Sequence, residues 1–146
     1  MRAVGVTATR YGLSAQQREH AHLMLRGLQL IHGADELHHG DCVGGDAEVA
    51  DIARRLGYVL VAHPPTAEGL RAFVPSDRTM PPALYLDRNR NIVDAVWFLL
   101  GYPDSRLERQ RSGTWSTIRY ARRTRRLRMV VAPDGACIDL PAEDVS

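Results

Sequence analysis

Lysine is absent from this 146-residue chain, and cysteine is scarce. All 19 basic residues are arginines, and so complete a replacement indicates a compositional bias of the source genome more than selection at single sites. The planar guanidinium fork nevertheless suits phosphate. The two cysteines, Cys42 and Cys137, are far apart and form no C-x-x-C pair, which argues against a cysteine-based zinc site and a disulfide framework. This cysteine content fits a reducing compartment.

The chain also lacks any apolar run close to the ~20 residues that cross a bilayer. No small-residue cleavage site follows a long apolar stretch, so residues 2–6 are predicted as a first strand and not as a signal peptide. We therefore expect a cytoplasmic location and no membrane partner. The length suits one domain, and the hydrophobic share of 45% and charged share of 25% argue against disorder.

Basic residues concentrate near the end of the chain, although the net charge is only +2. Six arginines fall within ten residues: Arg119, Arg122, Arg123, Arg125, Arg126 and Arg128. They fit either a nucleic-acid patch or a solvated helix end, where the helix dipole stabilises cations. Because no aromatic residues are interleaved to stack bases and the overall charge is balanced, nucleic acid is not favoured as a partner.

Apolar periodicity predicts alternating strands and helices. The predicted strands cover residues 2–6, 36–39, 58–62, 96–100 and 129–131. The predicted helices cover a segment from a Ser14 cap to about residue 33 with Leu23, Leu25, Leu28, Leu30 and Ile31 as its apolar positions, a segment from an Asp46 cap to Gly57, and residues 83–93 and 114–125. Five prolines predict an irregular loop between residues 63 and 82, a candidate lid.

Alternation of this kind predicts an α/β fold, a Rossmann-like three-layer α/β/α arrangement with a mostly parallel sheet of about five strands. Residues 1–132 form the expected nucleotide-binding domain, and residues 133–146 a tail or a short added strand through residues 136–138. Open parallel sheets bind ligands outside the carboxyl ends of their strands, so function is expected in the loops that follow them.

Three loop-to-helix junctions lie at that expected edge, where free backbone amides and glycines can receive an anion. They are residues 7–12 with Thr7, Thr9 and Arg10, residues 44–47 with Gly44, Gly45 and Asp46, and residues 111–114 with Ser112, Gly113 and Thr114. Each also has a simpler interpretation, as a surface arginine, a tight turn or an N-cap. Neither G-x-G-x-x-G nor G-x-x-x-x-G-K-[ST] occurs, so ordinary dinucleotide dehydrogenases and P-loop enzymes are not supported.

The histidines, Cys42 and most of the aromatic residues near these junctions are interpreted as structural. His38, His39 and His63 could meet Asp41 at the strand ends, but no metal-ligand spacing such as H-E-x-x-H is present. We expect these histidines to face solvent, and no metal site is predicted. Cys42 is interpreted as a small residue more than a reactive thiolate. Of three aromatic residues that could stack a base, Tyr11, Trp115 and Tyr120, the last two are expected to pack a helix on the sheet.

Over residues 2–132 the chain resembles the SLOG superfamily, which includes the LOG phosphoribohydrolases, the DprA DNA-processing proteins and small nucleotide-sensing domains. Three motifs carry the resemblance: H-G-D-C-V-G-G-D-A at 39–47, R-N-R-N-I-V-D at 88–94 and S-G-T-W-S-T-I-R-Y-A at 112–121. The resemblance implies a fold whose glycine-containing loops seat the phosphate and ribose of a nucleotide. Together with the junctions it gives an expected ligand-binding set of Thr7, Thr9, Arg10, Gly44, Gly45, Asp46, Arg88, Asn89, Ser112, Gly113 and Thr114.

LOG enzymes carry a P-G-G-x-G-T-x-x-E stretch whose glutamate is associated with cleavage of the N-glycosidic bond, and Thr117 stands at that glutamate's place here. The assisting arginine of the family corresponds to Arg88 or Arg90. Since departure of a base needs an acid or a carboxylate near the reacting carbon, the substitution favours binding over turnover.

The preferred hypothesis is therefore a sensor or carrier of a nucleotide or nucleotide derivative: a nucleoside monophosphate, ADP-ribose or a cyclic relative. The alternative is an N-glycosyl or phosphoribosyl hydrolase with a relocated carboxylate, for which Asp46 and Asp94, then Asp41 and Glu48, are the candidates. A DprA-like binder of single-stranded DNA is a third interpretation. The expected partner is the small-molecule ligand, no cofactor is predicted, and a homo-oligomer is compatible with the sequence.

Overall fold

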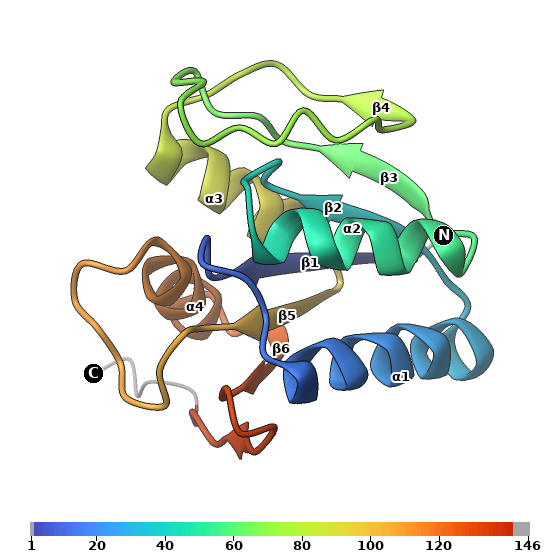
Figure 1. Cartoon of the computed structure of the whole chain (residues 1–146), viewed down its shortest axis with the longest axis vertical. Helices are drawn as coiled ribbons and strands as arrows, with labels where there is room; N and C mark the ends of the chain where they lie inside the picture. Colours follow the sequence, from blue (N-terminus) through green and yellow to red (C-terminus); the bar gives the residue numbers. More distant parts are fainter. Residues whose placement is uncertain (1, 142–146) are drawn as a thin grey trace.

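The computed structural model describes residues 2–141 and has three layers, a central sheet with two helices on each face (Figure 1). The strands are β1 (Arg2–Ala8), β2 (Ala34–His39), β3 (Val59–Ala62), β4 (Arg78–Thr79), β5 (Phe98–Tyr102), β6 (Leu127–Val131) and β7 (Cys137–Ile138). The helices are α1 (Ala15–His32), α2 (Gly45–Arg55), α3 (Tyr85–Ala95) and α4 (Gly113–Arg123). Helices α1 and α2 pack together on one face, and α3 and α4 on the other.

The strand order is β4-β3-β2-β1-β5-β6-β7, and every pairing is parallel except the antiparallel pair of β6 and β7. The predicted Rossmann-like α/β class is confirmed, with seven strands instead of about five. The two additional strands have two residues each: β4 lies inside the proline-rich loop, and β7 is the short added strand expected after residue 132. Two paired residues are too short for apolar alternation to distinguish a strand from a loop.

Strand β1 lies at the centre of the described sheet, where the order of the strands reverses. It pairs with β2 on one side and with β5 on the other, so that Thr7 lies beside Gly101 and Ala8 beside Tyr102. The chain departs in opposite directions from the carboxyl ends of β1 and β5, which opens a crevice at this switch point. Strand β5 begins at Phe98, two residues later than the predicted strand, and ends at Tyr102, which is fully buried in the core.

Helix α1 begins and ends where its caps predict. Ser14 and Gln17 form a reciprocal capping box, and Gly33 (φ +68°) ends the helix in the left-handed conformation. The predicted apolar face is partly wrong, because Leu23, Leu30 and Ile31 are 63%, 70% and 77% exposed. The buried positions of the helix are Gln17, Ala21, Leu25 and Leu28.

A polar residue on the buried face explains this difference. The Gln17 amide donates to the backbone carbonyls of Pro103 (2.8 Å) and Val131 (2.9 Å), so burial leaves its NH₂ group satisfied. Within the described residues 2–141, no helix is both long and apolar enough to span a membrane.

Candidate functional site

A cavity of about 520 Å³ lies at the switch point, bounded by the carboxyl ends of β1 and β2 and the amino ends of α3 and α4. Its volume falls within the range of small-molecule sites. The lining residues are Val6 to Tyr11, Gly40, Cys42, Asp46, Leu70, Tyr85, Leu86, Arg88, Asn89, Ile92, Asp104, Arg109, Arg111 to Thr114, and Thr117. The cavity is therefore at the edge of the sheet where the parallel topology predicts a ligand.

The first turn of α4 contributes free amides to this wall. The Ser112 hydroxyl accepts from the Trp115 N–H (3.2 Å), while the N–H groups of Gly113 and Thr114 have no hydrogen-bond partner among residues 2–141. A Cβ added at Gly113 would meet no atom within 4 Å. A helix start with free amides and open space in front of it can receive an anion.

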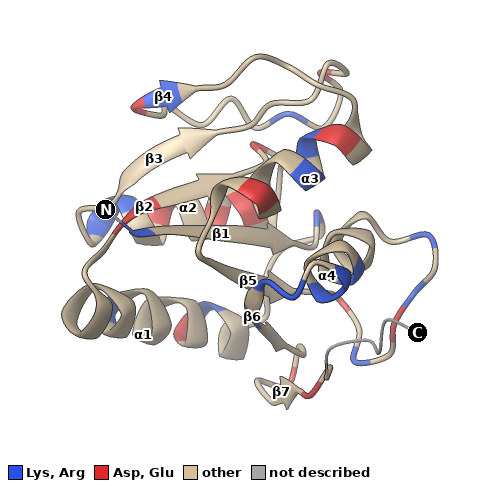
Figure 2. Cartoon of the chain, turned by 180° about the vertical axis from the view of Figure 1, so that it is seen from behind, with Lys and Arg blue, Asp and Glu red and all other residues tan. Residues whose placement is uncertain are grey.

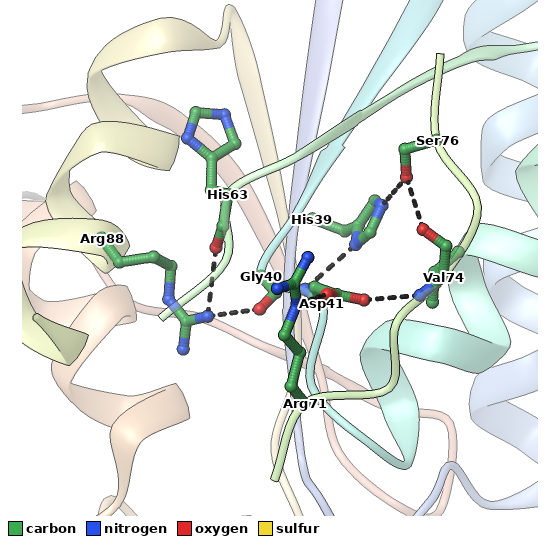
Figure 3. Close-up of polar contacts among 8 residues, drawn as sticks. All are labelled: His39, Gly40, Asp41, His63, Arg71, Val74, Ser76 and Arg88. Carbon is green, nitrogen blue, oxygen red and sulfur yellow. Dashed lines mark hydrogen bonds and ion pairs between the residues drawn. The ribbon is translucent and has the colours of Figure 1, made fainter. Parts of the chain in front are cut away.

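Arg88 is buried and held by backbone groups at the ends of two strands (Figure 3). Its Nη1 donates to the Gly40 carbonyl and to the His63 carbonyl (3.3 Å), and its Nε donates to Asn89 Oδ1 (2.8 Å). The guanidinium also lies 5.4 Å from the centre of the Tyr85 ring. These contacts fix a positive charge in the wall of the cavity.

Asp46 lies beside Arg88, and Gly40 separates the two side chains. A Cβ at Gly40 would come within 2.8 Å of both Asp46 Oδ2 and Arg88 Nη1, so only glycine fits there without displacing them. Burial raises the pKa of Asp46 from 3.8 to about 6, against the opposing effects of Arg88 and of nearby backbone hydrogen bonds. A fraction of this carboxyl group is therefore protonated near neutral pH.

Gly44 and Gly45 do not line the cavity, in contrast to the ligand-binding role expected for them. A Cβ at Gly44 (φ +87°) would lie 2.2 Å from the Arg10 carbonyl oxygen, and one at Gly45 would lie 2.5 Å from the Ala8 Cβ. The Gly45 N–H donates to the Thr9 carbonyl (2.8 Å). The two glycines thus let the start of α2 pack against the loop after β1.

The N-cap of helix α2 lies two residues before the predicted cap, Asp46. Gly44 is its N-cap residue and Asp46 lies inside the first turn, so Asp46 does not cap the helix as predicted. Its carboxyl group is directed to the cavity wall instead, where Gly40 and Arg88 surround it.

The loop after β1 contributes Thr7, Thr9 and Arg10 to the cavity wall, at the positions expected from sequence. Thr9 Oγ1 accepts from the Tyr11 N–H (3.1 Å), which tightens the turn. Arg10 and Tyr11 are exposed: the Arg10 guanidinium donates to the Tyr11 hydroxyl (2.8 Å) and lies 5.0 Å from its ring centre. Tyr11 is thus available at the cavity to a planar ligand group.

Several lining residues were not anticipated. Arg109 comes from the loop between β5 and α4, close to Arg111 of the predicted junction at residues 111–114, and Leu70, Tyr85 and Leu86 form an apolar wall. The available signal for Arg109 was its place in a loop that follows a buried strand. Nothing in the sequence indicated the apolar wall, and Leu70 reaches the cavity only through the fold of the long loop.

Residues considered for other roles also lie in the cavity wall. Thr117, at the place of the LOG glutamate, donates its hydroxyl hydrogen to the Gly113 carbonyl (2.9 Å). Burial raises the pKa of the Cys42 thiol, which disfavours the thiolate. Trp115, by contrast, does not line the cavity: it is fully buried in the core and cannot stack a ligand.

Among the candidate carboxylates, Asp46 alone lines the cavity with its side chain free of an ion pair in the described residues. Asp94 accepts from the Tyr120 hydroxyl (2.8 Å) outside the cavity, so neither residue contacts the candidate site. Glu48 accepts from the Leu13 N–H (3.1 Å) and is likewise outside the lining.

Asp41, the remaining candidate, anchors the long loop (Figure 3). Its carboxylate pairs with Arg71 (2.5 Å) and accepts from the Val74 N–H (2.8 Å), while its carbonyl accepts from the Ala72 N–H (2.8 Å). The structure thus holds residues 71–74 against the end of β2 and gives no support to a freely moving lid there. It also commits Asp41 to a structural role.

The three histidines are buried and do not face solvent as expected. The His39 Nδ1 accepts from the Asp41 N–H (3.0 Å), so its Nε2–H donates to Ser76 Oγ (3.0 Å; Figure 3). His38 lies between Glu36 (3.0 Å) and His63 (2.8 Å). Burial lowers the pKa of His39 and His63 to about 4.

His38 and His39 are buried because β2 is covered by helices and paired on both edges, and His63 follows β3 and donates its N–H to the His39 carbonyl (2.8 Å). No group of three potential metal ligands occurs among the described residues.

No protein-family model and no curated protein matches the chain. Solved structures do match it. A molybdenum cofactor binding protein from the phototrophic bacterium Rippkaea orientalis has a TM-score of 0.69 and 16% identity, over 90% of this chain and 76% of that one. The structural-genomics target TM1055 has a TM-score of 0.56 and 16% identity, over 83% and 68% of the two chains.

DNA processing protein A (DprA) from Streptococcus pneumoniae has a TM-score of 0.58 and 18% identity, over 90% of this chain and 50% of that one. At such identities the likeness concerns the fold. The comparisons therefore agree with the fold that the resemblance to the SLOG superfamily implies.

Proposed function

We propose that the chain binds a nucleotide or a nucleotide derivative in this cavity, as a sensor or a carrier. The observation that carries the proposal is the first turn of α4, where Gly113 and Thr114 line the cavity with amides that have no partner in residues 2–141. A phosphate group at this turn would accept from both amides and would lie at the positive end of the helix dipole. The candidate ligands are a nucleoside monophosphate, ADP-ribose or a cyclic relative.

The charges of the cavity wall also favour an anion. Four arginines line it, Arg10, Arg88, Arg109 and Arg111, against two acidic residues, Asp46 and Asp104. Asp104 is already paired with Arg109 (3.3 Å). Asp46 is partly neutral near pH 7 because burial raises its pKa to about 6. The wall therefore carries a net positive charge, and arginine forks can bind phosphate oxygens in pairs.

Another part of the wall suits a planar apolar group. Leu70 belongs to the loop between β3 and β4, and Tyr85 and Leu86 belong to the first turn of α3, whereas Ser112 to Thr114 lie at the start of α4. A ligand with a phosphate at one end and an aromatic base at the other would place the phosphate at the start of α4 and the base against the apolar residues. One neighbour of the fold is named for binding a molybdenum cofactor, which supports a small-molecule ligand and adds that cofactor to the compounds to be tested.

The test combines native mass spectrometry of what co-purifies with calorimetric titration of AMP and ADP-ribose. In Gly113→Val the added side chain enters open space, so the fold should persist while the approach to the α4 amides is blocked. Gly27→Val on α1 is the matched control, since a Cβ there also meets no atom within 4 Å and the residue is remote from the cavity. Equal nucleotide affinity in the two folded variants would refute the proposed site.

A second candidate function, hydrolysis of an N-glycosidic bond, is favoured by Asp46. A cavity carboxyl whose pKa is raised to about 6 can donate a proton to a departing base near neutral pH, as a general acid does. Thr117 has no acidic proton and is committed to the Gly113 carbonyl, so it cannot take the role of the LOG glutamate.

Release of free base from nucleoside monophosphates or ADP-ribose separates the two functions. A binder should release none above a buffer control. A hydrolase should release base, and Asp46→Asn should then lower turnover far more than substrate affinity, because the proton transfer occurs only in the transition state.

A further inference from the structure

Positive charge is concentrated along α4 and the segments that flank it. Residues 104–128 contain nine of the 19 arginines but only two of the 17 acidic residues, so the rest of the chain is net negative. Figure 2 shows this charge on α4 and on the chain that follows it. Arg109 and Arg111 line the candidate site, whereas the arginines after α4 serve no role in the proposed function.

The arginines after α4 surround a second cavity of about 300 Å³. It lies at the amino end of β6, on the edge of the sheet opposite the candidate site. Its lining is formed by Arg125 to Arg128, Val130 and the segment Ile138 to Pro141. Within the lining, Asp139 is the one acidic residue, and it forms no ion pair with these arginines among the described residues.

Arg128 is held in place by backbone carbonyls but keeps one donor unused. Its Nη1 donates to the Arg126 carbonyl (3.0 Å) and its Nη2 to the Leu140 carbonyl. The buried Nε of Arg128 has no hydrogen-bond partner in the described part of the chain. Burial and the nearby charge of Arg122 lower the pKa of Arg128, so the surroundings leave its charge incompletely compensated.

Arg126 also has side-chain donors without acceptors. Its Nε is also buried without a partner, and none of its side-chain nitrogens takes part in a hydrogen bond or ion pair within residues 2–141. A buried donor without an acceptor is destabilising, the more so when it is charged, so native proteins leave few of them. Both arginines line the same cavity and keep unused donors, which indicates that an acceptor belongs there.

We propose that this second cavity binds a phosphate group. A phosphate offers several acceptor oxygens and the opposite charge, whereas water compensates no charge and brings hydrogens of its own. Small shifts of the two guanidinium groups would turn their unused N–H groups to the oxygens. The phosphate can belong to a free ion or small ester, or to the phosphodiester backbone of a nucleic acid. The site is independent of the proposed nucleotide site.

Equilibrium dialysis of radiolabelled inorganic phosphate, at low salt and in the full chain, tests the proposal. The measurements use a Gly113→Val background, which closes the first site. Arg126→Gln removes the fork without breaking a hydrogen bond of the described structure, and it should weaken phosphate binding by about tenfold or more. Arg123→Gln, an equal charge change at an exposed position outside the lining, should change it less than about twofold.

Equal losses in the two variants would show a diffuse charge effect and overturn the proposal. Absence of any bound phosphate in Gly113→Val would also overturn it, while leaving the nucleotide site intact. Conversely, failure of Gly113→Val to reduce nucleotide affinity concerns the first site only. Displacement of phosphate by a thymidine oligonucleotide identifies a phosphodiester as the ligand, and persistence of bound phosphate identifies a free ion or small ester.

Discussion

Replacing Asp46 by asparagine should stabilise the protein in a pH-dependent manner. The substitution keeps the shape of the side chain and one of its two acceptor oxygens, replaces the other by an NH₂ group, and removes the ionisation. In the folded protein burial raises the pKa of Asp46 from 3.8 to about 6. Because the folded state binds this proton more tightly than the unfolded chain does, the contribution of Asp46 to stability is full below about pH 4 and is lost as the pH rises through 6.

The magnitude follows from the size of the shift. A difference of about two pKa units corresponds to about 3 kcal/mol, since each unit is worth 1.36 kcal/mol. The free energy of unfolding of Asp46→Asn, minus that of the wild type, should therefore increase by about 3 kcal/mol from below pH 4 to above pH 6 and stay constant at higher pH. Titration of the histidines is common to both proteins and cancels in the difference.

Urea unfolding of both proteins across about pH 4 to 8 measures this difference. Asp51→Asn is the matched control: Asp51 is on the same helix, is largely exposed and pairs with Arg55 (3.1 Å), so its effect should stay within about 1 kcal/mol at every pH. A difference that is flat, or that falls as the pH rises, would refute the reasoning that burial dominates at Asp46.

Three further predictions concern the same region. Burial lowers the pKa of His39 and His63 to about 4, so in Asp46→Asn the urea midpoint should rise as the pH increases from about 4 to 6.5; a midpoint that falls over this range contradicts it. Gly40→Ala should destabilise the protein by roughly 1–3 kcal/mol in urea unfolding and weaken nucleotide binding in calorimetry, because its Cβ displaces Arg88; unchanged values would contradict the contact. Arg10→Lys should weaken nucleotide binding although the charge is kept; equal affinity would make Arg10 a solvated surface residue.

The fold could be predicted where short segments carry strong local signals. The Ser14 capping box and the glycine at position 33 set the ends of α1, and runs of apolar residues set β1, β3 and β5. The buried face of α1 could not be predicted from apolarity, because Gln17 is buried by hydrogen bonds to segments more than 80 residues away. Strand β4 depends in the same way on a partner strand and not on its own two residues.

Much of the candidate site could be located from sequence because parallel strands bring the loops after them to one edge. Nine of the eleven expected ligand-binding residues line the cavity. The exceptions are Gly44 and Gly45. Their position in the sequence suggested that a ligand approaches the backbone there, but in the structure the loop after β1 makes this close approach. Gly40, which belongs to the motif at 39–47 but not to the expected ligand-binding set, is the glycine that separates Asp46 from Arg88.

The stability cost at Asp46 bears on the choice between binding and hydrolysis. A penalty of about 3 kcal/mol is a large share of the 5–15 kcal/mol that stabilises a domain, and an amide would avoid it. Arg88 does not remove the penalty, because its Nη1 and Nε are committed to Gly40, His63 and Asn89. A carboxyl retained at this cost should act on the ligand, either as a hydrogen-bond partner or as an acid. If Asp46→Asn lowers affinity and wild type releases no base, the carboxyl serves binding; if affinity persists and base release stops, it serves as the acid.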